Sequence, residues 1–150
     1  MQKKEQRNGT VKKYLTENSG LQKGVLKVYT IGDCYLATSG LPGIRDDHAE
    51  VMAKFSVELQ KIFEVVTTEL SYALGSETTD LKLRCGLHSG PITAGVLWGL
   101  QSRFEIFGDT ANTASHMERT GIPTRIQISQ ETTDFLIKAG KESWVNPIYG

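Results

Sequence analysis

One long helix with a continuous apolar face limits the folds open to this chain. Between Asp47 and Gly75, apolar side chains recur at steps of three and four residues, the spacing of one buried helix face. The residues on this face are Met52, Phe55, Leu59, Ile62, Phe63, Val66 and Leu70. Asp46 or Asp47 is the expected N-cap, and Gly75 ends the helix. Such a face needs a second layer of structure, and a sheet is the expected partner.

Alternating and β-branched segments supply the strands of that sheet. The sequence predicts strands at residues 25–31, 34–39, 81–88, 92–97, 103–107 and 125–128. Gly32-Asp33 joins the first two strands as a hairpin turn. A helix containing Asn112 follows the fifth strand, and Ser129 is expected to cap a short helix over residues 131–139. Strands joined by helices indicate an α/β sandwich, with one layer of helices on the sheet.

Composition favours one globular domain in the chain of 150 residues. We expect a basic polar leader at residues 1–23, a domain at 24–145 and a tail at 146–150. The 17 basic and 17 acidic residues cancel, so no global field points to nucleic acid or a membrane surface. The two cysteines fit no metal spacing, and no apolar run approaches the ~20 residues of a membrane helix.

The segment over residues 107–121 carries the most specific pattern. It reads Phe-Gly-Asp-Thr-Ala-Asn-Thr-Ala-Ser-His-Met-Glu-Arg-Thr-Gly. Asn112 and His116 stand four residues apart, so both side chains leave one face of a helix. A polar pair fixed on a rigid helix suits a ligand with dispersed negative charge. The segment resembles the signature of class III nucleotidyl cyclases, the adenylate and guanylate cyclase catalytic domains.

Two further segments carry the same resemblance in the same order. They are the hairpin at residues 29–35, Tyr-Thr-Ile-Gly-Asp-Cys-Tyr, and residues 86–91, Gly-Leu-His-Ser-Gly-Pro. The resemblance implies a ferredoxin-like α/β domain with an antiparallel-rich sheet. It also implies conversion of a nucleoside triphosphate into a 3′,5′-cyclic nucleotide and pyrophosphate, and a site built between two domains packed head to tail.

The hairpin resembles the metal-bearing hairpin of that family, which makes Asp33 the expected ligand of Mg²⁺ or Mn²⁺. These ions prefer hard oxygen ligands, and a pair of them can activate the ribose 3′-hydroxyl and neutralise the triphosphate. The family places a second metal Asp on a strand before this hairpin. The sequence has no Asp before Asp33, so this second ligand is not found.

The resemblance assigns Asn112 to the ribose and the position of His116 to the α-phosphate. The family has Arg at that second position, because a guanidinium is always charged and forms forked hydrogen bonds. His116 is shorter and mostly neutral at pH 7. Arg119, one turn further, is a possible partial substitute. The family's Lys for the triphosphate, after its last helix, has no counterpart before Gly150.

Base selection would fall to Tyr29 and Glu105, with Gly32 also in the nucleotide-binding segment. Glu105 could accept hydrogen bonds from guanine or from the adenine amine, and Tyr29 can donate or accept. Neither residue pair known in the family is present, so GTP and ATP both stay open, although the remaining motif leans toward the guanylate type.

Three alternatives follow from these substitutions. The chain is a cyclase domain acting in cyclic-nucleotide signalling, a catalytically degenerate domain that regulates or dimerises, or a truncated chain whose leader replaces the first strand and helix. We expect a cytoplasmic location, or the cytosolic part of a membrane receptor cyclase. His88 is expected to be a structural residue at a strand end rather than a catalytic one.

Overall fold

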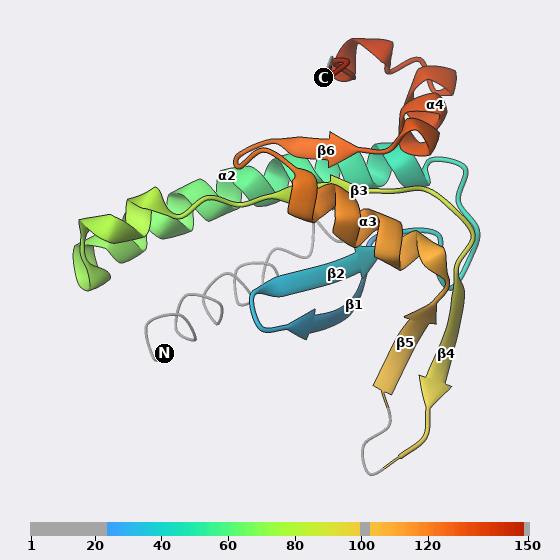
Figure 1. Ribbon diagram of the computed structural model, residues 1–150, viewed down its shortest axis with the longest axis horizontal. Coiled ribbons are helices and arrows are strands. Elements are labelled where there is room, and N and C mark those ends of the chain that lie inside the picture. The colour runs from blue at the N-terminus through green and yellow to red at the C-terminus, as the bar shows by residue number, and fades with distance from the viewer. Residues whose placement is uncertain (1–23, 100–102, 149–150) are drawn as a thin grey trace.

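The computed structural model describes residues 24–99 and 103–148, so the expected leader lies outside the described residues. Figure 1 shows the long helix α2 beside short paired strands, with α3 crossing between the strand pairs. In chain order the elements are β1 (Leu26–Ile31), β2 (Cys34–Thr38), α2 (His48–Leu74), the 3-10 helix η2 (Ser76–Asp80), β3 (Cys85–Leu87), β4 (Thr93–Leu97), β5 (Arg103–Phe107), α3 (Asp109–Thr120), β6 (Ile126–Ile128), α4 (Gln130–Lys138) and the 3-10 helix η3 (Glu142–Trp144).

The strands of the described residues pair two by two. β1 and β2 form an antiparallel hairpin around Gly32, whose φ of 58° is the left-handed conformation that the turn requires. β4 and β5 form a second antiparallel pair, and β3 pairs with β6 in parallel. The predicted α/β class and the first hairpin are confirmed. The strands described here make three separate ladders, however, rather than one continuous sheet.

Helix α2 begins and ends where the sequence predicts. Asp47 occupies the N-cap position, but the prediction of a side-chain cap is wrong. Both carboxylate oxygens of Asp47 instead accept hydrogen bonds of 2.8 Å from the Arg45 guanidinium. The backbone carbonyl of Asp47 still accepts from Val51 N at 3.0 Å, so the first turn is closed by the main chain alone. Gly75 ends the helix with a φ of 102°.

The buried core of the described residues is small. Its six apolar members are Ala49, Phe55, Val66, Cys85, Leu87 and Leu136. Only Phe55 and Val66 of the seven apolar residues predicted on α2 are fully buried, and the other five are half-exposed. The long apolar face is therefore only partly covered by the described strands.

Two local predictions have different outcomes. The predicted strand at 81–88 is too long, because only Cys85–Leu87 joins a ladder. The alternation of apolar and polar residues reflects which side chains are buried. The Leu83 carbonyl accepts one backbone hydrogen bond, from Thr124 N at 2.8 Å. The Ser129 cap is confirmed, because Ser129 Oγ accepts from Thr132 N at the start of α4.

Candidate functional site

The start of α3 is built on a glycine. Gly108 has a φ of 117° and links the last residue of β5 directly to the first residue of α3. A side chain would strain this backbone conformation. Thr110 Oγ1 donates a hydrogen bond of 2.6 Å to the carbonyl of Pro91 and so ties the first turn to the segment that follows β3. The position of the helix is therefore fixed at its N-terminus.

Asn112 and His116 both lie on α3 and are exposed to solvent. Their spacing places the two side chains on one face of the helix, as predicted. No residue of α3 is fully buried. The pair is thus available to a ligand or to a second protein chain, and it presents a neutral amide next to an imidazole.

Glu105 approaches this region from β5. Its half-buried carboxylate forms an ion pair with Arg103, with 3.1 Å between Oε1 and Nε. β1, which carries the half-buried Tyr29, lies beside β5. Tyr29 and Glu105 therefore stand on neighbouring strands, and Glu105 and Asn112 lie on either side of the Gly108 junction.

Asp33 lies in the turn of the β1–β2 hairpin, four residues beyond Tyr29, and lines a cavity of about 1300 Å³. From α3, Ser115, Glu118 and Arg119 reach the same cavity. Of the six predicted site residues, Asp33 alone lines this cavity; Tyr29 and Gly32 belong to the same hairpin, and Glu105, Asn112 and His116 lie on β5 and α3.

The described residues do not complete a two-ion metal site. Asp33 offers one carboxylate, and residues 24–99 and 103–148 contain no cluster of three or more His, Cys, Asp or Glu side chains suited to a metal ion. Hard divalent ions need several oxygen ligands. A metal at Asp33 would therefore draw its other ligands from elsewhere, including a bound nucleotide.

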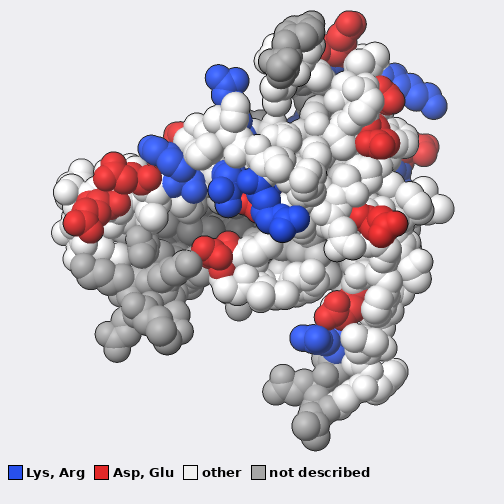
Figure 2. Space-filling view, in the orientation of Figure 1, with Lys and Arg blue, Asp and Glu red and all other residues white. Residues whose placement is uncertain are grey.

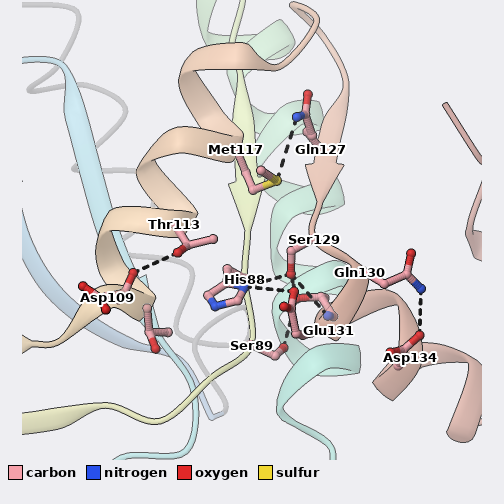
Figure 3. A network of polar contacts seen from close by, with 12 residues as sticks. His88, Ser89, Asp109, Thr113, Met117, Gln127, Ser129, Gln130, Glu131 and Asp134 are labelled. Atoms are coloured by element: carbon pink, nitrogen blue, oxygen red, sulfur yellow. Dashed lines mark hydrogen bonds and ion pairs between the residues drawn. The ribbon is translucent and has the colours of Figure 1, made fainter. Parts of the chain in front are cut away.

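His88 lies in a polar network that joins β3 to α4 (Figure 3). Its Nδ1 lies 2.8 Å from Ser129 Oγ and 3.5 Å from Glu131 Oε2. Thr132 Oγ1, fully buried, donates a hydrogen bond of 3.1 Å to Ser89 Oγ. Through these contacts the cap of α4 is held against the end of β3.

The combination of Ser129, His88 and Glu131 is not a nucleophilic triad. A relay needs the serine and the carboxylate on opposite ring nitrogens, whereas here both face Nδ1. Ser129 Oγ also accepts the capping hydrogen bond from Thr132 N and is buried. The geometry agrees with the structural role expected for His88.

Helix α3 rests directly on β3 at Gly86. A Cβ at Gly86 would meet the backbone of Ala114 and Glu118, with 2.8 Å to Glu118 Cα. Arg84, two residues earlier, forms an ion pair of 2.8 Å with Glu118. The helix that carries Asn112 and His116 is therefore fixed by a backbone contact and a charged contact.

Three supporting residues were not singled out from the sequence for these roles: Arg103, Thr110 and Gly86. Arg103 and Glu105 stand two apart on a strand and so share a face, a signal that could have identified the pair. The roles of Thr110 and Gly86 depend on contacts with distant segments, which local patterns do not report.

Figure 2 shows basic side chains gathered over the middle of this face, with acidic side chains toward its left end and right side. The two signs balance over the whole sequence, whose net charge is zero.

The comparison with known families follows the same segments. Residues 12–146 match the family described as the adenylate and guanylate cyclase catalytic domain. The chain belongs to this cyclase family. The match includes the hairpin of Asp33 and the whole of α3, which confirms the resemblance that the motifs indicate.

Curated relatives of this cyclase-family chain include guanylate cyclases. The receptor-type guanylate cyclase gcy-28 of Caenorhabditis elegans is 44% identical over 115 residues, 76% of this chain and 8% of the relative. Guanylate cyclase 2G of Rattus norvegicus is 46% identical over 118 residues, 77% of this chain and 10% of the relative. The chain thus spans about a tenth of the length of these relatives.

Solved cyclase structures share the fold. The guanylate cyclase domain of RhGC from Catenaria anguillulae, in complex with GTP, has 34% identity and a TM-score of 0.69, over 91% of this chain and 71% of that one. The guanylyl cyclase Cya2 has 20% identity and a TM-score of 0.73, over 87% and 66%, which is a likeness of fold alone. Among the described residues, no helix has the length and apolar character of a membrane span.

Proposed function

We propose that this cyclase domain binds a purine nucleoside triphosphate and forms a 3′,5′-cyclic nucleotide and pyrophosphate as one half of a dimeric site. The observation that carries the proposal is the junction at Gly108. It joins the strand of Glu105 to the exposed face that holds Asn112 and His116. A nucleotide needs polar contacts to its base, its ribose and its phosphates, and Glu105, Asn112 and His116 follow one another in that order.

In this proposal each side chain contacts a different part of the nucleotide. Glu105 accepts hydrogen bonds from the base, held in place by Arg103. Asn112 orients the ribose, and His116 donates a hydrogen bond to the phosphate whose charge grows during ring closure. Tyr29, on the neighbouring strand, and the Gly32 turn complete the base and phosphate contacts.

Asp33 is proposed as the one metal ligand that this chain supplies, for Mg²⁺ or Mn²⁺. Such an ion, when bound, would neutralise phosphate charge and favour loss of the ribose hydroxyl proton. The described residues around Asp33 do not supply a full ligand set. The proposal therefore requires the remaining metal ligands to come from the nucleotide phosphates and from a second chain.

Separation of Asp33 from the α3 pair supports a site shared between two domains. Asp33 lines one cavity, while Asn112 and His116 face solvent elsewhere. In a head-to-tail dimer, Asp33 of one domain would meet Asn112 and His116 of the other. The partner is a second copy or another cyclase domain.

GTP is the favoured substrate, and ATP is the alternative. The relatives are guanylate cyclases, and the similar domain from Catenaria anguillulae holds GTP. A related rhodopsin-guanylyl cyclase core with converted specificity, 34% identical with a TM-score of 0.67, is in complex with ATPalphaS. The acidic Glu105 can accept from either base, so both nucleotides belong in the test.

A catalytically degenerate domain that regulates a partner cyclase is the second candidate. His116 stands where the family has Arg, and Asp33 is the one carboxylate that lines the cavity from the hairpin. The similarity to a receptor-type cyclase supports placing either form on the cytosolic side of a membrane receptor, or free in the cytoplasm.

The test measures cyclic GMP and cyclic AMP formed by the full chain from GTP or ATP with Mn²⁺. We expect weak activity that rises about 100- to 1000-fold in His116→Arg, because an oriented charged donor is restored. Asn112→Ala should remove the gain, and the surface change Asp134→Asn should leave it unchanged. If His116→Arg makes no product from either nucleotide, the catalytic proposal is wrong. Altered activity of an added cyclase domain would then support the regulatory candidate.

A further inference from the structure

A smaller cleft of about 290 Å³ lies between the C-terminal half of α2 and the segment 79–83, which leaves η2. In Figure 1 the chain turns at η2 and runs back beside α2 toward β3. Thr124, two residues before β6, completes the lining. None of the six predicted site residues lines this cleft, so it shares no residue with the nucleotide site proposed above. We call it the Gln60 cleft.

Gln60 lines this cleft and carries a hydrogen-bond donor without an acceptor. Its Nε2 is buried and has no hydrogen-bond partner among the described residues. Burial raises the pKa of the nearby Cys85 thiol and the Gln60 amide opposes that rise, but sulfur is a weak acceptor and forms no hydrogen bond with Nε2. Buried polar groups in native proteins are almost always paired. An oxygen acceptor brought by a ligand would supply the missing partner.

Thr124 is held in an unfavourable backbone conformation at the same cleft. Its φ of 67° lies in the left-handed region, which a β-branched residue rarely adopts. Among the residues that the structure describes, no other non-glycine residue has a positive φ. A hydrogen bond of 2.8 Å from Thr124 N to the Leu83 carbonyl keeps the residue in place. Strained residues of this kind gather at ligand sites, so Thr124 is a second and independent feature that marks the Gln60 cleft.

The polar lining of the Gln60 cleft offers both a cation and a carboxylate. Lys82 makes a hydrogen bond of 3.5 Å to the Thr79 carbonyl, which is too long to be strong. Glu64 is exposed on α2. The hydroxyl groups of Thr67 and Thr68 donate to the Glu64 carbonyl at 3.0 and 2.8 Å, so their oxygens can still accept. This lining is complementary to a ligand that carries a negative and a positive group.

We propose that the Gln60 cleft binds a small zwitterion, an α-amino acid with an aliphatic side chain. The ligand carboxylate accepts hydrogen bonds from Lys82 and Gln60, and the ligand ammonium group donates to Glu64. The aliphatic side chain packs on the apolar part of the lining, which consists of Phe63, Leu81 and Leu83. At about 30 Å³ for each water-sized group, the cleft holds about ten non-hydrogen atoms, which is close to the size of leucine.

The test measures binding of L-leucine to the full chain through the amide chemical shifts of isotope-labelled protein. We expect saturable shifts, including those of the Gln60 side-chain amide, with a Kd on the order of millimolar for so small a ligand. Isocaproate, which lacks the ammonium group, and isoamylamine, which lacks the carboxylate, are the matched controls. Each should bind at least tenfold more weakly. Shifts that do not saturate with leucine, or an analogue that binds as tightly as leucine, would overturn the proposal.

Two variants locate the binding site. Lys82→Met should weaken leucine binding at least tenfold, whereas Lys138→Met, which changes an exposed lysine of α4 outside the cleft, should bind as the wild type does. Gln60→Leu removes the unpaired donor, so it should weaken binding without lowering the thermal midpoint of unfolding. Wild-type affinity in Lys82→Met or Gln60→Leu would mean that leucine binds elsewhere and that the proposal is wrong. None of these readouts uses a nucleotide, so this inference and the proposed cyclase activity can fail separately.

Discussion

His88 Nδ1 lies 2.8 Å from Ser129 Oγ and thereby joins the end of β3 to the cap of α4 across 41 positions of sequence. Ser129 Oγ also accepts a hydrogen bond from Thr132 N. This one side chain therefore both contacts the end of β3 and caps α4. Just beyond His88, the chain reaches Pro91, which holds the first turn of α3. The segment that follows β3 therefore contacts two helices: α4 through His88, and α3 through Pro91.

We predict that Ser129→Ala lowers the free energy of unfolding by about 1 kcal/mol, since it removes the α4 cap. His88→Ala should cost about 1 kcal/mol through loss of the part-buried hydrogen bond to Ser129. The double variant should cost measurably less than the two losses together, because both changes remove one shared contact. Urea unfolding of the four proteins measures this coupling. Strict additivity would mean that the hydrogen bond contributes nothing.

Gly86→Ala should destabilise the domain by about 3 kcal/mol or more, because the added methyl group meets backbone atoms that cannot rotate away. Gly43→Ala is the matched control, since nothing lies within 4 Å of its Cβ position. We expect the control to unfold within about 0.5 kcal/mol of the wild type. Thermal unfolding followed by circular dichroism separates the two variants, and similar midpoints would contradict the close contact between α3 and β3.

Stability should fall at alkaline pH because of Cys85. Burial raises the pKa of the Cys85 thiol from 9.0 to about 11, with Glu118 adding to the effect. The folded state thus keeps a proton that the unfolded state releases. This contribution is complete below pH 9 and is lost as the pH rises to about 11. Unfolding free energy should fall there by up to about 1.4 kcal/mol per pH unit.

In Cys85→Ala the free energy of unfolding should fall less steeply between pH 9 and about 11. Urea unfolding at several pH values measures this pH dependence. Cys34→Ala is the control. Burial also raises the pKa of Cys34 and of Tyr35, but Cys34 is exposed and Tyr35 is retained in both variants. The steep part should therefore remain in Cys34→Ala. An unchanged slope in Cys85→Ala would contradict the assignment.

Arg103→Gln should weaken nucleotide binding without unfolding the domain. Arg103 is largely exposed, so its ion pair contributes little to stability, but the pair fixes the direction of the half-buried Glu105 carboxylate. We expect KM for GTP or ATP to rise about three- to tenfold with a smaller change in kcat, in the active His116→Arg background. Glu105→Gln should raise the same KM at least as much. If Arg103→Gln lowers only thermal stability, Arg103 has no positioning role.

The sequence predicted the parts of the fold that depend on neighbouring residues. The hairpin around Gly32, the apolar face of α2 and the Ser129 cap are each encoded within one segment, and all three are present. The strand predicted at 81–88 is shorter than expected, because alternation marks burial and not pairing. The Asp47 cap failed since Arg45 competes for the same carboxylate.

The sequence names candidate site residues, which stay predictions, but it does not indicate how they are arranged. Motifs single out Asp33, Asn112 and His116, and the folded structure shows that only Asp33 of these three lines the large cavity. The Arg103–Glu105 pair was within reach of a strand-spacing argument. The large cavity beside α2 was not, because it depends on contacts between segments far apart in the sequence.

Gly108 gives this domain a joint of a single residue between the strand of Glu105 and the helix of Asn112 and His116. β4 pairs with the strand, and β3 lies against the helix. Because Thr110 and Gly86 also hold α3 in place, the fold itself sets the distance between Glu105 and the face of Asn112 and His116. A nucleotide that spans this junction would meet a spacing already set before it binds.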